Sequence, residues 1–139
     1  MMVLADTSAW SLLLRRTGRE LSPVAYELTK LIERNRAMII GVIRQEVLSG
    51  IRGRDQFDDL RSRLRPFPDV VVDARDHETG AGYHNLCRAK GIQGSLADFL
   101  ICAVAARRNL AILTADADFS RYARLVPIRL HEYEKPKAG

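Results

Sequence analysis

The stretch Gly94–Phe119, which reads GSLADFLICAVAARRNLAILTADADF, decides how the rest of the chain is interpreted. Ser95 is a typical helix N-cap residue, and Asp98 three residues later fits a capping box. The apolar run 99–106 is too short to cross a bilayer and predicts a buried helix. Arg107–Asn109 closes this helix with cations near the negative end of the helix dipole.

A short buried strand is predicted directly after this helix. Residues 110–114 form a short apolar run typical of a buried strand, and Asp116 and Asp118 follow it. In open α/β sheets, ligands bind at the edge where the parallel strands end. We therefore expect any further acidic residue that follows a strand to be part of the same site.

The rest of the chain repeats this alternation of strands and helices. A three-layer α/β/α fold follows, with a central parallel sheet of four to five strands. Residues 1–133 are expected to form a single domain and 134–139 a flexible tail. A long helix is expected over 73–90, although Gly80 and Gly82 weaken that prediction. The strands are expected at 2–5, 37–40, 70–72, 110–114 and 126–128, and further helices at 7–14, from 22, from 42, at 55–64 and at 122–125.

Composition bounds the class of protein and its partners. The chain has 139 residues with 47% hydrophobic and 28% charged residues, which argues against disorder. Its net charge is +5 with a pI of about 9.6, mostly from arginine, which suits either a polyanionic partner or an ordinary solvated surface. The two cysteines, Cys87 and Cys102, are expected to be reduced, and no signal peptide or membrane segment is recognisable. A cytoplasmic location is therefore predicted.

Four carboxylates are candidates for a common site, although each has an ordinary structural explanation. Asp6 or Asp116 could be only an N-cap, Asp98 only part of a capping box, and Glu46 only an exposed helical residue. Asp6, Glu46 and Asp116, however, follow three different predicted strands, and Asp98 opens the helix that leads into the last of them. Their joint placement at one sheet edge is what an acidic site requires.

Carboxylates that meet in this way repel one another, so a cation must offset their charge at neutral pH. Oxygen ligands favour Mg²⁺ or Mn²⁺ over zinc. His77 and His84 are seven residues apart, which does not fit a zinc-protease motif. An acidic pocket on a basic chain is typical of a metal-dependent nuclease, in which arginines hold the phosphate backbone.

Four segments together resemble a PIN-domain protein, and in particular the VapC-type toxins of bacterial toxin–antitoxin pairs. The segments are VLADTSAW at 3–10, RQEVLSG at 44–50, LADFLICA at 96–103 and LTADADF at 113–119. The resemblance covers the chain from residue 3 to about residue 128. Each motif alone is weak, but the four in this order and spacing are specific.

The resemblance implies a Mg²⁺- or Mn²⁺-dependent endoribonuclease. If metal-activated water attacks the RNA phosphodiester, the 2′-hydroxyl is not needed as nucleophile, and products with 5′-phosphate and 3′-hydroxyl ends are expected. By position, the family's catalytic and metal-binding carboxylates correspond to Asp6, Glu46, Asp98 and Asp116. A less constant acidic position corresponds to Asp118, and hydroxyl residues that support the cluster correspond to Ser8 and Thr114. The resemblance further implies a homodimer that a VapB-type antitoxin neutralises. Because the sequence contains no recognisable membrane segment, no membrane partner is expected.

Two other functions remain open on the sequence alone. A catalytically idle PIN module would bind RNA or a protein through its arginines. A phosphatase or phosphoacceptor domain would also gather aspartates at strand ends. Asp116 and Asp118 lie too near the C-terminus for the first, and the lysines that follow the last strand, Lys135 and Lys137, lie in what looks like a tail, which argues against the second.

Overall fold

The computed structural model describes residues 1–15 and 21–134. Its centre is a sheet in which all strands are parallel and lie in the order β2-β1-β3-β4. The predicted α/β/α class with a parallel sheet is thereby confirmed. Residues 135–139 of the predicted tail lie outside the described residues, and the domain boundary at 133 stays a prediction. The strands are β1 (Val3–Ala5), β2 (Ala37–Met38), β3 (Ala111–Leu113) and β4 (Arg129–Leu130).

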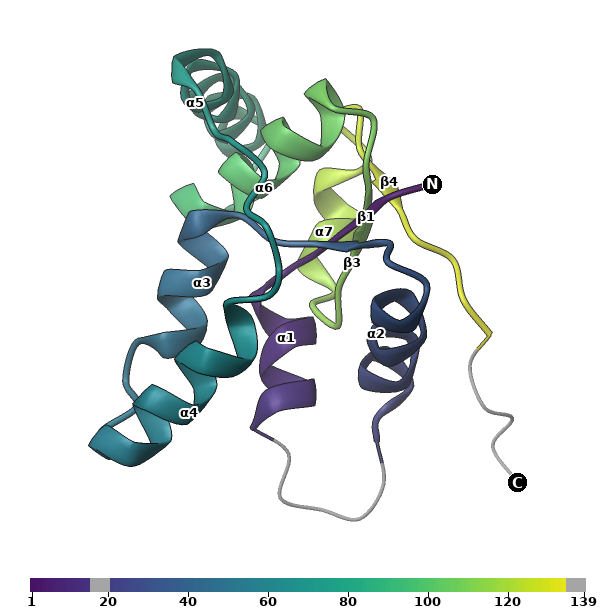
Figure 1. Ribbon diagram of the computed structural model, residues 1–139. Helices are drawn as coiled ribbons and strands as arrows, with labels where there is room; N and C mark the ends of the chain where they lie inside the picture. Colours follow the sequence, from purple (N-terminus) through teal and green to yellow (C-terminus); the bar gives the residue numbers. More distant parts are fainter. Residues whose placement is uncertain (16–20, 135–139) are drawn as a thin grey trace.

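The strand order explains the layering of the helices. The chain moves from β1 outward to β2, and then crosses back over β1 to reach β3 and β4 on the other side. Because crossovers between parallel strands are right-handed, connections that run in opposite directions lie on opposite faces of the sheet. Figure 1 shows α1 and α2 below the strands and α5 and α6 above them.

The helices mostly begin and end where the local sequence predicts. Ser22 caps α2 with Pro23 at its first position, and Ser95 caps α6 by accepting the amide of Asp98 at 3.0 Å. Gly91, with φ of +79°, follows α5 in the left-handed region that favours glycine. The helices are α1 (Thr7–Leu14), α2 (Pro23–Glu33), α3 (Gly41–Leu48), α4 (Arg54–Leu64), α5 (Ala74–Ala89), α6 (Leu96–Arg107) and α7 (Asp118–Tyr122).

Three of the predicted elements are wrong in detail. Residues 70–72 form no strand, because Val71 is 76% exposed and its carbonyl accepts from the Arg108 side chain, which leaves only an isolated parallel bridge between Ile39 and Asp69. The last strand is Arg129–Leu130 rather than 126–128, since Pro127 has no amide to donate. The last helix is α7 at Asp118–Tyr122, earlier than the predicted 122–125.

Gly80, which weakens the sequence-based prediction of α5, is where α5 and α6 approach closely. A Cβ at this position would lie 3.2 Å from the Phe99 carbonyl oxygen and 3.4 Å from the Leu100 backbone. At Gly82, two residues on, a Cβ would meet no atom within 4 Å. The first glycine therefore serves helix packing, while the second is exposed helix interior.

A buried ionic cluster joins the start of α5 to the end of α6. Asp76 is fully buried and accepts from Arg107 at 2.5 Å and from Arg108 at 2.7 Å. Asp76 and Asp73 also form the capping box of α5. Although burial raises the pKa of the Asp76 carboxyl, the hydrogen bonds from Arg108, the Asp73 backbone and Arg107 outweigh it and lower the pKa to about 2.

The hydrophobic core lies on both sides of the sheet. The largest buried side chains are Trp10, Tyr122, Phe99 and Phe119, so these aromatic rings serve core packing. Cys87 and Cys102 are both buried and free. Among the described residues, no helix is long and apolar enough to cross a membrane.

The two glycines of α5 give a matched pair of substitutions. Gly82→Ala should stabilise the protein by roughly 0.5–1 kcal/mol, because alanine loses less backbone freedom in a helix. Gly80→Ala should destabilise it by about 1 kcal/mol, because the new methyl group pushes α6 away. The free energy of unfolding from urea titration checks both, and equal stabilisation by the two variants would contradict the packing argument.

The Asp76 cluster predicts a pH-dependent contribution to stability. The pKa of Asp76 is lower in the folded state than its ordinary value of 3.8, so its stabilisation is complete above about pH 5 and is lost as the pH falls toward 2. Asp76→Asn should cost about 2–3 kcal/mol at pH 7. The difference in the free energy of unfolding between Asp76→Asn and the wild type, measured by urea titration, should decrease steadily from pH 5 to pH 3.

The control is Asp58→Asn, which removes an exposed pair with Arg61. This substitution should cost well under 1 kcal/mol at any pH. A loss for Asp76→Asn that is independent of pH would show that packing, rather than charge, carries the effect.

Candidate active site

The acidic site lies where the direction of the crossovers reverses, between β1 and β3. From β1 the chain leaves toward β2, and from β3 it leaves toward β4, which opens a crevice at the carboxyl ends of these two neighbouring strands. Asp6 directly follows β1, and Asp116 follows β3 by three residues. Asp98 is in the first turn of α6, which runs back against the strands and so begins at the same edge.

Asp6 is the most firmly held of these carboxylates. Its Oδ1 accepts from the Ser8 hydroxyl at 2.7 Å and from the Ala9 amide at 3.0 Å, and its Oδ2 accepts from the Thr114 hydroxyl at 2.6 Å. It therefore caps α1, as the structural explanation predicts, while also facing β3. Ser8 and Thr114, the hydroxyl residues expected to support the cluster, both contact Asp6.

Asp98 is held by a residue that sequence reasoning did not identify. The Tyr122 hydroxyl donates to Asp98 Oδ2 at 2.7 Å. No return bond from the Asp98 side chain to the Ser95 amide is formed, so the capping box predicted for these two residues is only half present. The carboxylate is thus turned away from its own helix start and toward α7.

Gly94 makes room for this contact. A Cβ on Gly94 would lie 2.3 Å from the Tyr122 hydroxyl oxygen and 2.9 Å from the Phe99 ring, so a larger residue cannot be accommodated without moving Tyr122. The Tyr122 ring packs between Phe99 and Phe119, with centroid distances of 4.7 and 5.1 Å. Its hydroxyl is therefore fixed in position by the core.

Asp116 and Asp118 face different partners. Asp116 Oδ1 accepts the Asp118 amide at 2.9 Å, and the Asp116 amide donates to the Thr114 hydroxyl at 2.9 Å. The Asp118 carboxylate pairs with Arg121 at 2.8 Å within α7. Asp118, the least constant of the predicted acidic positions, is thus engaged in a local ion pair.

Glu46 lies on the α1 side of the site. It is an exposed residue of α3, and its Oε1 accepts from the Thr7 hydroxyl at 2.7 Å. Thr7 is the residue after Asp6, so one hydrogen bond links the predicted glutamate to the loop that carries the central aspartate.

No cationic side chain of the residues that the structure describes offsets the charges of the site. Burial raises the pKa of Asp6, against the lowering effect of its hydrogen bonds, and the charge of Asp116 raises it further. Burial likewise raises the pKa of Asp98, with added repulsion from Asp116 and Asp6. Within residues 1–15 and 21–134, no lysine, arginine or histidine pairs with Asp6, Asp98 or Asp116.

The carboxylate oxygens of the site are the kind of ligand that a hard divalent cation prefers, but the side chains alone do not complete the coordination of such an ion. In the described part of the chain, no three His, Cys, Asp or Glu side chains lie close enough to hold a metal ion by themselves. Mg²⁺ is commonly bound by one or two carboxylates while it keeps several waters. Oxygen-only donors with raised pKa values and no cationic partner suit such an open, partly hydrated site.

Three features of the site were missed from the sequence, namely Tyr122, Gly94 and Thr7. The signal for Tyr122 was weak, because a tyrosine in a short helix near Phe119 is indistinguishable from a core aromatic. Gly94 precedes an N-cap serine, where glycine is unremarkable. Only the packing of α7 on the start of α6 reveals their connection to Asp98.

The hydrogen bond between Tyr122 and Asp98 can be measured by a double-mutant cycle. Tyr122→Phe keeps the ring and should cost about 1–2 kcal/mol in metal-free buffer at pH 7.5, because it removes a donor to a charged acceptor. Asp98→Asn alone should stabilise the protein, since it removes one of three mutually repelling charges. In the Asp98→Asn background, Tyr122→Phe should cost less than half as much.

The control for this cycle is Tyr26→Phe on α2, where the ring is 56% exposed. Its free energy of unfolding should stay within 0.5 kcal/mol of the wild type, as for most surface changes. Equal costs of Tyr122→Phe in both backgrounds would show that the hydroxyl does not act on Asp98.

Comparisons with known proteins agree with this architecture. The sequence profile of the PIN domain matches residues 3–125. Ribonuclease VapC11 of Mycobacterium tuberculosis is 34% identical over 132 residues, which cover 92% of this chain and 96% of VapC11. A VapC ribonuclease of Mycobacterium bovis matches with the same identity and coverage.

Solved structures share the fold at lower identity. VapBC2 from Rickettsia felis, bound to a DNA fragment from its promoter, has a chain that matches with a TM-score of 0.76 at 15% identity, covering 96% of this chain and all of that one. FitAcB from Neisseria gonorrhoeae matches with a TM-score of 0.73 at 21% identity, covering 94% of this chain and 97% of that one. The chain therefore belongs to the PIN domain family, and within it to the VapC-type proteins.

Proposed function

We propose that this protein is the toxin of a toxin–antitoxin pair and acts as a metal-dependent endoribonuclease. The observation that carries the proposal is the convergence of Asp6, Asp98 and Asp116 at the β1–β3 crevice with neutral donors only. The 34% identity to VapC ribonucleases over most of the chain supports RNA as the substrate.

Asp6, Asp98 and Asp116 would hold Mg²⁺ or Mn²⁺, one or two of them directly and the rest through waters that the ion keeps, with Glu46 either as a further ligand or as the residue that orients water. A bound divalent cation would polarise the scissile phosphate and lower the pKa of a bound water. In the hydrolysis, water forms the new bond to phosphorus and the bond to the 3′ oxygen breaks. The products then carry 5′-phosphate and 3′-hydroxyl ends.

The protein's own contribution is the orientation of the carboxylates. Asp6 is immobilised by three hydrogen bonds, and its neighbours Ser8 and Thr114 tie it to the residues after β3. Asp98 is fixed by Tyr122, whose ring is locked in the core. Side chains held in one geometry need not reorganise during the reaction, which favours catalysis by positioning.

A VapB-type antitoxin is the expected partner. The similar solved structures include VapBC2 and FitAB, each bound to a DNA fragment, which supports a partner of this kind. As expected for VapC-type proteins, we propose that the chain forms a homodimer and that the antitoxin neutralises it. A catalytically idle module that binds RNA or a protein is the alternative, and the cleavage experiment separates the two.

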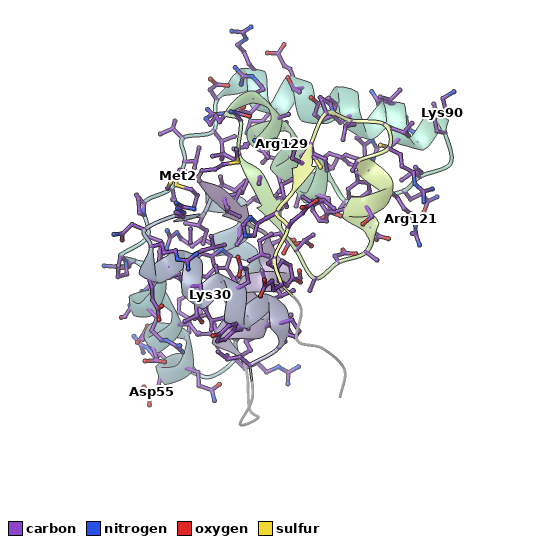
Figure 2. The ribbon with its side chains drawn as sticks, turned by 90° about the vertical axis from the view of Figure 1, so that its right-hand side faces the viewer. Met2, Lys30, Asp55, Lys90, Arg121 and Arg129 are labelled. Carbon is purple, nitrogen blue, oxygen red and sulfur yellow. The ribbon has the colours of Figure 1, made fainter. Side chains whose placement is uncertain are left out.

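The test is incubation of the purified, antitoxin-free protein with total RNA. Discrete fragments should form with Mg²⁺ or Mn²⁺, disappear with EDTA, and be reduced at least about 100-fold in Asp98→Asn, as for the loss of a preorganised charged group. The matched control is Asp55→Asn in the first turn of α4, at the lower left of Figure 2, which should cleave like the wild type.

A second measurement reports on the metal without relying on activity. Mn²⁺ should raise the thermal unfolding midpoint of the wild type and of Asp55→Asn, because a ligand that binds only the folded state stabilises it. The rise should be largely lost in Asp98→Asn. Folded protein that shows neither cleavage nor a metal-induced shift would favour the idle module.

A further inference from the structure

A cavity of about 620 Å³ adjoins the acidic site on its β4 side. Its lining includes the apolar residues Ile112 and Leu130, and Ser120 of α7. Asp116 and Thr114 belong both to this cavity and to the acidic site. The volume is within the range of typical small-molecule sites.

The position of the cavity follows from the sheet topology. β3 and β4 are neighbouring parallel strands, so the segment that follows β4 lies at the same sheet edge as Asp116. Figure 2 shows α7, marked by Arg121, and β4, marked by Arg129, on the same side of the molecule. An RNA strand whose scissile phosphate lies at the acidic site and that continues toward β4 must pass this cavity.

The wall of the cavity is formed by an ordered segment after β4. The His131 amide donates to the Ile112 carbonyl at 2.7 Å, and the His131 ring contacts Glu27 on α2 at 2.6 Å. The ring of Tyr133 lies within 14° of parallel to the His131 ring, with the centroids 6.4 Å apart. Tyr133 is partly buried against the core, so a flat aromatic surface is held in place there.

The charge of the lining excludes a phosphate as its occupant. Asp116 and Glu132 contribute carboxylates, and among the described residues that line the cavity there is no lysine or arginine. His131, the one basic side chain of the lining, is already engaged with Glu27. An anionic backbone would be repelled here, whereas a neutral base with amino groups can donate to carboxylate and hydroxyl oxygens.

We propose that this cavity is a nucleobase subsite, in which Tyr133 stacks on the base of a nucleotide adjacent to the scissile phosphodiester. The inference deepens the proposed function and rests on it for the identity of the ligand as RNA. A subsite of this kind gives the enzyme a preference for where it cuts, because the base must enter the cavity for the neighbouring phosphate to reach Asp116.

The test is binding of fluorescent ribo-oligonucleotides by the full chain in the Asp98→Asn background, where cleavage does not interfere. Tyr133→Ala should raise the dissociation constant about 10-fold, in line with the stacking of one base, whereas Tyr133→Phe should stay within about twofold. Tyr26→Ala on α2 is the control and should leave binding unchanged.

Abasic oligonucleotides show whether a base is what the cavity binds. A series of oligonucleotides carries one abasic nucleotide each, at successive positions. The abasic site at one of these positions should raise the dissociation constant as much as Tyr133→Ala does. With that abasic oligonucleotide, Tyr133→Ala should have no further effect. Ser120→Tyr, which fills the cavity without removing core packing, should weaken binding of the intact oligonucleotide only.

Cleavage by the wild type separates this inference from the proposed function. In one outcome the wild type cleaves RNA, Tyr133→Ala cleaves at the same sites with the same KM, and no abasic position weakens binding. This outcome overturns the subsite and leaves the nuclease standing. If the wild type cleaves nothing yet the abasic pattern is found, the subsite stands and the nuclease is overturned.

Discussion

The pairing of β1 with β3 is the constraint on which the site depends. Val3, Leu4 and Ala5 pair in parallel with residues 111–113, and the bond from the Asp6 amide to the Leu113 carbonyl at 2.9 Å extends the ladder beyond the strands. This register places the first residues of α1 beside the residues after β3. A slip of one residue would turn every side chain of the strand to the other face and separate Asp6 from Thr114.

The site is organised by neutral donors, and this choice has a cost. Hydroxyl and amide groups orient Asp6 and Asp98 without neutralising them, so the repulsion between the carboxylates is left in the folded protein. Ion pairs are used elsewhere, at Asp76 and at Asp118. The arginines therefore stabilise Asp76 and Asp118, while Asp6 and Asp98 keep their charge for a ligand of opposite sign.

The sequence predicts the fold class and the convergence of acidic residues because both follow from strand–helix alternation. It fails at residues 70–72, where three valines favour a strand but the Arg108 side chain donates to the Val71 carbonyl and Val71 is exposed. It also misses Tyr122 and Gly94, because their role depends on how α7 packs against α6. Periodicity within one element carries no information on such contacts between elements.

The two halves of the acidic crevice come from opposite ends of the chain. Residues 3–6 are synthesised more than a hundred residues before their partner strand is complete at residue 113. Contacts between residues so far apart in sequence form late, so the crevice cannot assemble on a partial chain. A chain that stops before β3 would therefore lack the crevice, and only a chain that extends past residue 113 can bring Asp6 and Thr114 together.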